Sequence, residues 1–288
     1  MISIVICTRA NDINEVLKAN IQNTIGVPYE LILIDNSKSE LSIFSAYNKG
    51  AALSKYDIVC FMHDDISYQS NDWGTIVAGQ LHKSNVGAVG VAGAPYFSTL
   101  PGAWWSGGLI CQHVSGETEY AYAPIQDYAL PVVVLDGLWF CIKKKLFTQI
   151  SFDENRFSGF HFYDVDISLQ IKHLGYEILS LYNITMSHSP GKLDVVWLQN
   201  ALILQKKWEK QLPFTVVKLN YTQKVTIEYR VLAEYMTAMR ANGTSTLKTI
   251  QFAVNQILKH RLKRFNIVFP FVFIGLAFRQ LFKKLGLR

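Results

Sequence analysis

Cysteine is scarce in this sequence: only Cys7, Cys60, Cys111 and Cys141 occur among 288 residues. No two of them have the Cys-x-x-Cys spacing, which argues against a cysteine metal site or a disulfide framework. Cys7 and Cys60 lie within apolar stretches typical of strands, so we expect them to be small buried side chains. Half of the residues are hydrophobic, which excludes global disorder and allows a full core.

Acidic residues are absent after Glu234. Residues 235–288 carry ten Lys and Arg and no Asp or Glu, so residues 1–234 carry a net charge of −4. A basic end on a slightly acidic body indicates an anionic partner for that end alone, either a membrane or a nucleic acid.

A hydrophobic run long enough to span a bilayer is also lacking. Residues 266–278 are almost wholly apolar, but Pro270 and Gly275 interrupt them and a span needs about 20 residues. Basic clusters at 259–264 and 279–288 flank this run, which favours an interfacial anchor on an anionic leaflet over nucleic-acid binding. The alternative is a helix packed on the catalytic domain. The N-terminus shows no charged leader or cleavage site, so we expect a cytoplasmic protein, peripheral on the cytoplasmic face of the membrane.

Strand-like and helix-like stretches alternate through residue 91. We predict strands at 2–7, 29–34, 57–62 and 86–91 and helices at 12–22, 41–54 and 72–82. This alternation predicts a parallel sheet with helices on both faces. Residues 93–131, rich in Gly, Pro, Trp and Tyr, are expected to form loops and short antiparallel strands over the site. Further strands are predicted at 132–135, continuing at 138–143, and at 177–182, and helices at 164–174 and 195–210.

Polar residues follow three of the predicted strands. They are Thr8 and Arg9, Asp35 and Asn36, and His63, Asp64 and Asp65. Ligands of open α/β sheets bind beyond the carboxyl ends of the strands. The sequence therefore predicts one shared site at this edge.

Asp64 and Asp65 are the strongest candidates for metal binding. Adjacent carboxylates repel each other, so a cation is expected between them, and Mg²⁺ or Mn²⁺ bridging a diphosphate suits oxygen ligands. The alternative is a solvated Asp-Asp turn. Asp35 and Asn36 are candidates to bind a ribose or a base edge, and an Asx-turn or helix cap is the alternative.

Two further candidates lie later in the chain. Asp164 and Asp166 open a predicted helix directly after the aromatic stretch 159–163, which is able to line a sugar pocket. One of them is a candidate general base for a sugar hydroxyl, although acids at a helix start also simply complement the helix dipole. His188 follows a late strand and is either a ligand or a packed or surface residue.

Taken together, these motifs resemble family 2 glycosyltransferases of the GT-A type over roughly residues 1–212. The matching segments, in the order of the family pattern, are SIVICTR at 3–9, LIDNS at 33–37, AYNKG at 46–50, FMHDD at 61–65 in place of the DxD motif, Asp136-Gly137 followed by Lys143-Lys144, SFDE at 151–154, and YDVDISLQIKHLGY at 163–176.

The resemblance implies a GT-A mixed α/β sheet flanked by helices, with a helical appendage at 213–288. It assigns the nucleotide to Thr8, Arg9, Asp35, Asn36, Asn48 and Asp64, the metal to Asp65 with His188, and the general base to Asp164 with Asp166 in reserve. The acceptor or sugar side is expected at Trp104, Trp105, Asp136, Gly137, Trp139 and Tyr163. Core packing competes with sugar stacking at the tryptophans, most of all at Trp139.

The implied function is inverting, metal-dependent transfer from a nucleotide-diphosphate sugar, a UDP-sugar, to a glycan or lipid-linked acceptor in cell-surface polysaccharide synthesis. Two departures stand against it, because His63 replaces the first acid of DxD and Tyr163 replaces the Glu of a Glu-Asp pair. They are the features that favour one alternative, a catalytically inactive, membrane-docked sugar-binding or scaffold protein. A sugar nucleotidyltransferase, the other alternative, would need a Gly-rich basic loop after the first strand, and residues 7–12 contain no glycine.

Overall fold

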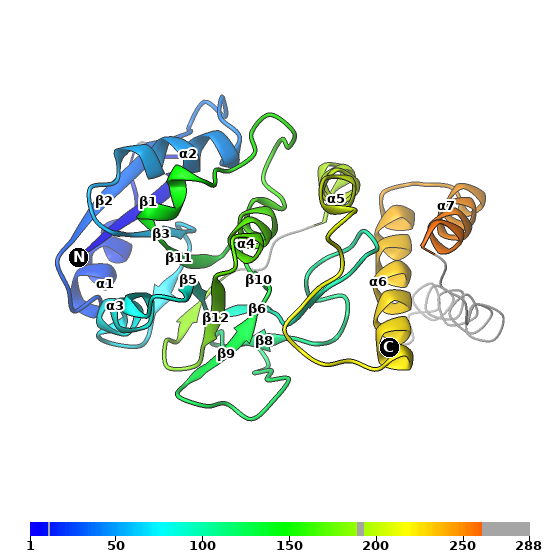
Figure 1. Ribbon diagram of the computed structural model, residues 1–288. Helices are drawn as coiled ribbons and strands as arrows, with labels where there is room; N and C mark the ends of the chain where they lie inside the picture. Colours follow the sequence, from blue (N-terminus) through cyan, green and yellow to red (C-terminus); the bar gives the residue numbers. More distant parts are fainter. Residues whose placement is uncertain (11, 189–192, 261–288) are drawn as a thin grey trace.

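The computed structural model describes residues 1–10, 12–188 and 193–260 (Figure 1). Its centre is a seven-stranded mixed sheet. The strand order is β2 (Tyr29–Asp35), β1 (Ile2–Thr8), β3 (Ile58–Met62), β11 (Trp139–Lys143), β5 (Val86–Gly90), β12 (Glu177–Leu181) and β9 (Ala129–Val132). Strands β2, β1 and β3 are mutually parallel, as are β5 and β12, whereas β11 and β9 run antiparallel to their neighbours.

Helices cover both faces of the sheet, as the alternating pattern predicts. Helix α2 (Ile43–Leu53) lies above the sheet in Figure 1, and α1 (Glu15–Thr24) and α3 (Trp73–His82) lie below it. Gly50 explains how closely α2 approaches, because a Cβ atom there would lie 2.2 Å from Cγ1 of Val5. The glycine of the AYNKG segment therefore allows close helix–sheet packing.

The strand at 138–143 differs from its prediction. It does not continue the preceding strand: β10 (Val134–Leu135) pairs with β6 (Ala92–Ala94), whereas β11 inserts between β3 and β5 in the main sheet. A wholly parallel sheet is therefore the wrong prediction, and the mixed sheet of the GT-A resemblance is confirmed. The turn at residues 136–138 separates the two strands and delivers Asp136 to the edge where β3 ends, since His63 N–H donates to Leu138 O at 3.0 Å.

Short antiparallel ladders accompany the main sheet, and β6, β7 and β8 are the short strands that the prediction for residues 93–131 anticipated. Strand β6 pairs with β8 (Cys111–Gln112), β7 (Tyr96–Phe97) pairs with β14 (Phe214–Thr215), and β4 (Ser67–Tyr68) pairs with β13 (Met186–Ser187). The β4–β13 pair brings His188 back to the end of β3, where its ring contacts His63. The 3₁₀ helix η1 (Lys144–Thr148) and helix α4 (Tyr163–His173) complete this half.

Three helices follow, α5 (Val195–Trp208), α6 (Tyr221–Ala241) and α7 (Thr246–Lys259), at the right of Figure 1. Helix α6 is tied to the rest of the chain by Glu228, which is only 3 % exposed. Its carboxylate accepts hydrogen bonds from Tyr96 Oη at 2.5 Å, Ser98 Oγ at 2.6 Å and the N–H groups of Thr99 and Leu100 at 3.0 and 3.2 Å.

The described part of the C-terminal region therefore packs on the sheet domain, and the boundary at 213 stays a prediction. Among helices within the described ranges, none is both long and apolar enough to cross a membrane. The predicted anchor from residue 259 onward lies mostly outside them, since they end at 260.

Candidate active site

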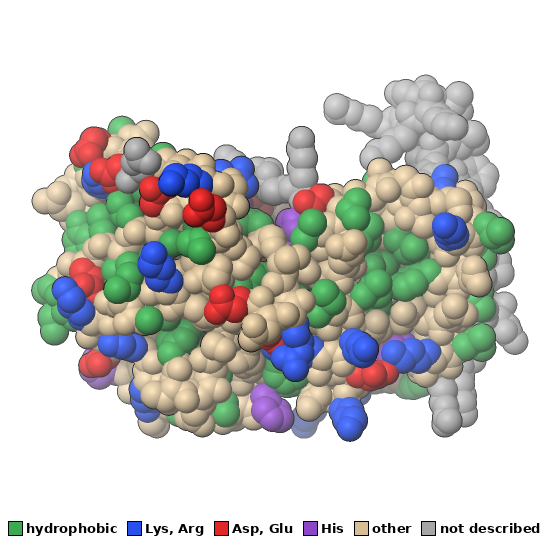
Figure 2. Space-filling model, turned by 90° about the horizontal axis from the view of Figure 1, so that it is seen from above, with side chains coloured by type: hydrophobic (Ala, Val, Ile, Leu, Met, Phe, Trp, Pro, Cys, Tyr) green, Lys and Arg blue, Asp and Glu red, His purple; other side chains and the backbone are tan. Residues whose placement is uncertain are grey.

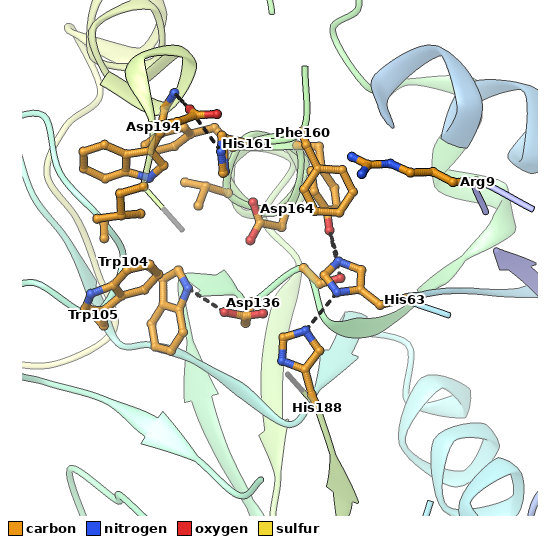
Figure 3. Close-up of a pocket in the computed structure, with 17 residues that line it drawn as sticks. Arg9, His63, Trp104, Trp105, Asp136, Phe160, His161, Asp164, His188 and Asp194 are labelled. Carbon is orange, nitrogen blue, oxygen red and sulfur yellow. Dashed lines mark hydrogen bonds and ion pairs between the residues drawn. The ribbon is translucent and has the colours of Figure 1, made fainter. Parts of the chain in front are cut away.

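A pocket of about 390 Å³ opens at the carboxyl edge of the sheet, where β3 and β11 meet the start of α4 (Figure 3). Its polar lining comes from segments far apart in the sequence. These residues are Arg9, His63, Asp136, His161, Asp164, His188 and Asp194, together with the aromatic side chains of Trp104, Trp105, Phe160, Phe162, Tyr163 and Trp197. The predicted meeting of strand ends is thus found for Arg9 after β1 and His63 after β3.

Two histidines face each other on one side of this pocket. The Nδ1 atom of His63 lies 3.0 Å from Nε2 of His188, and the latter lies 3.9 Å from Oδ1 of Asp65. All three donor atoms lie within 4.8 Å of one another. Burial and the neighbouring charge of His188 lower the pKa of His63, so its imidazole is neutral at pH 7 and its lone pair is available to a cation.

This trio fits a divalent metal ion. Bonds of about 2.1 Å at a right angle place two donors roughly 3 Å apart, which matches the separation of the two imidazole nitrogens. Asp65 is exposed and offers the carboxylate. Sequence reasoning placed Asp65 and His188 here but treated His63 as the loss of an acid rather than as a donor. Asp64 is exposed beside the trio and is not part of it.

Asp164 lies in the first turn of α4 and faces the pocket across from Asp136 (Figure 3). Burial, reinforced by the negative charge of Asp136, raises the pKa of Asp164 to about 7. Backbone N–H groups of Val165 and Gly137 offset part of this shift. Asp136 itself is fixed by two donors, Trp104 Nε1–H at 3.0 Å to Oδ2 and Leu138 N–H at 2.8 Å to Oδ1.

Asp166, the reserve candidate for the base, does not face the pocket. Its side chain is 1 % exposed and accepts from Lys207 Nζ at 2.8 Å, Trp208 Nε1–H at 2.9 Å and Gln170 Nε2–H at 2.8 Å. The expectation of a catalytic role is corrected: this carboxylate joins α4 to α5, because side chains two positions apart on a helix point in different directions.

Of the three tryptophans predicted to contact a sugar, Trp104 and Trp105 line the pocket, whereas Trp139 lies in the core. Trp105 is 37 % exposed and stands perpendicular to Trp104, whose edge binds Asp136. Trp139 does not reach the pocket: it is fully buried and packs edge-on against Trp73, with ring centroids 5.9 Å apart. The core-packing alternative therefore holds for Trp139 and the expected sugar contact is corrected.

Asp35, the last residue of β2, and Asn36, which follows it, lie beside the end of β1, with the N–H of Asn36 donating to Thr8 O at 2.8 Å. The side chain of Asn36 closes its own loop through the backbone of Leu41, and Thr8 Oγ1 accepts from the N–H of Ala10. Asp35 is exposed, and its Oδ1 accepts from the N–H of Ser37 at 2.8 Å, the Asx-turn considered as the alternative.

Arg9 differs from these, because it lines the pocket and extends toward Phe160 and His63 (Figure 3). Within the described ranges, no carboxylate forms an ion pair with it. The structure therefore keeps Arg9 and the exposed oxygen of Asp35 available to a ligand.

Asn48 holds a neighbouring segment instead of the expected nucleotide, whereas Gly137 lines the pocket and its expected acceptor contact stays a prediction. Both ends of the Asn48 amide hold the segment after η1, donating to Phe152 O and Glu154 Oε1 and accepting from Phe152 N–H, so the expected nucleotide contact is corrected. Gly137 lies under the Tyr163 ring, and a Cβ atom there would approach the Tyr163 hydroxyl to 2.3 Å.

Sequence reasoning did not single out several lining residues. Phe160 stacks obliquely on His63 with centroids 5.3 Å apart, and His161 lies 3.4 Å from the carboxylate of Asp194, the N-cap of α5. Trp197 closes that side and is buried. The aromatic stretch 159–163 was the only signal for the first two, whereas nothing local marks Asp194 as more than a helix cap.

Comparisons with known proteins agree with this architecture. The family model described as a glycosyltransferase-like family matches residues 3–183, more than half of the chain. No curated protein matches the sequence. Among solved structures, GalNAc-T7 with UDP, GalNAc and Mn²⁺ superposes with a TM-score of 0.55 at 12% identity, covering 88% of this chain and 54% of that one. The chain thus spans about half the length of that relative.

Two other solved structures are also similar. S. aureus TarS 1–349 gives a TM-score of 0.45 at 12% identity, covering 85% of this chain and 74% of that one. A197 from STIV gives 0.41 at 13% identity, covering 66% and 86%. From the family match, and from a fold shared with GalNAc-T7, we conclude that the chain belongs to the glycosyltransferase-like family and is a glycosyltransferase of the GT-A fold.

Proposed function

We propose that this glycosyltransferase is inverting and metal-dependent, and that it transfers a sugar from a UDP-sugar to a hydroxyl group of a glycan or lipid-linked acceptor. One observation carries the proposal: Asp164, with a carboxyl pKa raised to about 7, lies in the same pocket as His63 and His188. A proton acceptor and a metal-binding pair facing one cavity are what a single displacement at a sugar carbon requires.

Asp164 is proposed to remove the proton of the acceptor hydroxyl. Its pKa near 7 suits a general base at neutral pH. As the acceptor oxygen forms its bond to the anomeric carbon, the bond from that carbon to the diphosphate breaks, and the electron pair leaves with the diphosphate. Asp136 is held through both oxygens by Trp104 and Leu138, so it is not proposed as a nucleophile. A single displacement without an enzyme nucleophile inverts the configuration.

The donor diphosphate is proposed to bind between Arg9 and the His63, Asp65 and His188 trio. His63, Asp65 and His188 would hold a divalent cation there, which would supply Lewis-acid stabilisation of the leaving group. Two imidazoles with one carboxylate suit Mn²⁺ better than Mg²⁺, which prefers an all-oxygen shell. The GalNAc-T7 structure contains UDP, GalNAc and Mn²⁺, which supports the same donor class and metal for this chain. Thr8, Asp35 and Asp64 remain proposed contacts of the nucleoside.

The acceptor is proposed to enter past Trp105, since this exposed ring and Phe160 offer faces to a sugar. A lipid-linked acceptor, an anionic membrane partner and a role in cell-surface polysaccharide synthesis rest on the basic, apolar C-terminal sequence. On the described helix α7, Leu247 and Leu258 are 76 % and 71 % exposed. Figure 2 shows hydrophobic side chains among Lys and Arg at that end of the molecule. A peripheral position on the cytoplasmic face of a membrane follows as a proposal.

The contacts of the two residues that motivated the sugar-binding or scaffold alternative support a transferase instead. His63 contributes one ligand atom to the trio, and the hydroxyl oxygen of Tyr163 lies 2.8 Å from Nε2 of His63. The two residues that replace acids of the family pattern therefore both place polar groups at the site.

Thermal-shift screening of UDP-, GDP- and TDP-sugars with and without Mn²⁺, followed by detection of released nucleotide, tests the proposal. We expect UDP-sugars to raise the melting temperature only with metal and the wild-type protein to turn them over. Equal stabilisation in chelator, or no turnover with any donor and acceptor, would contradict it.

A further inference from the structure

The two replacements that distinguish this chain from the family pattern touch each other. His63 follows β3 and Tyr163 begins α4, exactly one hundred positions later, yet Nε2 of His63 lies 2.8 Å from the hydroxyl oxygen of Tyr163. The same hydroxyl donates to Gly137 O at 3.0 Å. Tyr163 therefore joins the end of β3, the turn before β11 and the start of α4 through one oxygen atom.

The proton count at this oxygen links the tautomer of His63 to the hydrogen bond between Tyr163 and Gly137. A tyrosine hydroxyl has one proton, and a carbonyl oxygen only accepts. When the Tyr163 proton is given to Gly137 O at 3.0 Å, the hydroxyl oxygen is left as an acceptor, and its 2.8 Å contact with His63 is then satisfied by an imidazole that carries its proton on Nε2. Neutral imidazole has a single N–H, so Nδ1 is then bare and faces His188 Nε2 at 3.0 Å.

We infer that Tyr163 is a positioning residue, which holds His63 in the Nε2–H tautomer so that Nδ1 is presented to a divalent metal ion. The inference rests on the proposed function. Metal-binding histidines commonly donate their second N–H to a neighbouring acceptor, and loss of such a partner costs about 10–100-fold in metal affinity or activity.

The surroundings restrict Tyr163 to this position. The ring is 3 % exposed and packs edge-on against Tyr47 and Phe44, with centroids 5.4 and 6.3 Å away. Gly137 leaves the space that the hydroxyl fills, because any Cβ atom there would lie 2.3 Å from it. Asp164 is the next residue, so the helix turn that aims Tyr163 at His63 also sets the proposed base in the pocket.

Two variants of the full chain test this inference. Tyr163→Phe removes the hydroxyl and keeps the ring. Tyr235→Phe is the matched control, since Tyr235 is a buried tyrosine whose hydroxyl donates to Leu198 O at 2.8 Å, away from His63 and Tyr163. Mn²⁺ alone is titrated into each protein, with free ion followed by electron paramagnetic resonance. We expect the dissociation constant to rise about 10–100-fold in Tyr163→Phe and to stay within about threefold in Tyr235→Phe.

A spectroscopic measurement on the wild-type protein keeps the test independent of folding defects. In metal-free protein labelled with ¹⁵N-histidine, His63 should show a protonated Nε2 and a bare Nδ1, and Tyr163→Phe should lose this single tautomer. A protonated Nδ1 in the wild type, or unchanged Mn²⁺ affinity in Tyr163→Phe, would overturn the inference while leaving metal-dependent transfer by the wild type intact. Wild-type protein that binds no Mn²⁺ would overturn both.

Discussion

Replacing Asp164 by asparagine is expected to stabilise the protein while removing most of its activity. The carboxyl pKa is about 7 in the folded protein against a usual value of 3.8. Three pH units correspond to about 4 kcal/mol of unfavourable free energy for keeping the group ionised. This is an upper limit, because Asp164 is partly exposed and water reaches its charge. Asparagine keeps the shape and carries no charge, so it does not meet this cost.

The sign and the pH window follow from proton binding. Because the folded pKa is raised, the folded protein retains a proton that the unfolded chain releases between about pH 4 and pH 7. Wild-type stability therefore falls with rising pH across this window, by at most about 1.4 kcal/mol per unit from this group, and is level above it. The free energy of unfolding of Asp164→Asn, relative to that of the wild type, should therefore increase from pH 4 to pH 7 and stay constant above pH 7.

Urea denaturation of both proteins at several pH values between 5 and 8.5 measures this advantage, and sugar transfer is assayed in parallel. Transfer should be roughly 10²–10⁴-fold slower in Asp164→Asn, and wild-type transfer should rise with pH up to about 7. Asp166→Asn is the control: asparagine has one oxygen and no charge, so it cannot accept from both Lys207 and Trp208, and it should be less stable than the wild type. The reasoning would be refuted if Asp164→Asn were less stable than the wild type at every pH, or if the difference in their free energies of unfolding did not change with pH.

Three further outcomes are expected. Asp65→Ala and His188→Ala should each abolish the Mn²⁺-dependent rise in melting temperature with UDP, measured by thermal shift, since each removes a donor of the trio. Glu228→Leu should lower the free energy of unfolding by about 3 kcal/mol or more in urea titrations, because several buried donors lose their acceptor. A chain ending at His260, which keeps α7 intact, should fail to sediment with anionic liposomes that bind the full chain; equal sedimentation would refute the membrane anchor.

The sequence alone determined the order of the first strands and helices and the edge at which the site lies. Buried strands such as residues 2–8 and 58–62 are continuous apolar runs bounded by polar residues. Alternation of strands and helices places the strand ends together, so Arg9, His63 and Asp65 were predicted at one edge. Asp164 was also predicted, from the helix start and the aromatic residues before it.

Tertiary structure alone decided which of the neighbouring candidates face the pocket. Asp164 and Asp166 are two positions apart, yet one faces a pocket and the other Lys207. Their difference depends on α5, which lies about forty residues later. Trp139 and Trp105 were both candidate sugar contacts in the sequence. Trp139, however, lies on the central strand β11 and is fully buried.

The contact between His63 and Tyr163 was likewise invisible in the sequence, where each looked like the loss of an acid. Hydrogen-bond distances between residues a hundred positions apart are fixed by the antiparallel insertion of β11 and by the space above Gly137. Local patterns report which backbone an individual segment prefers, whereas the donor set of a site depends on how separate segments meet. That meeting is set by the packing of the whole core, and no single segment encodes it.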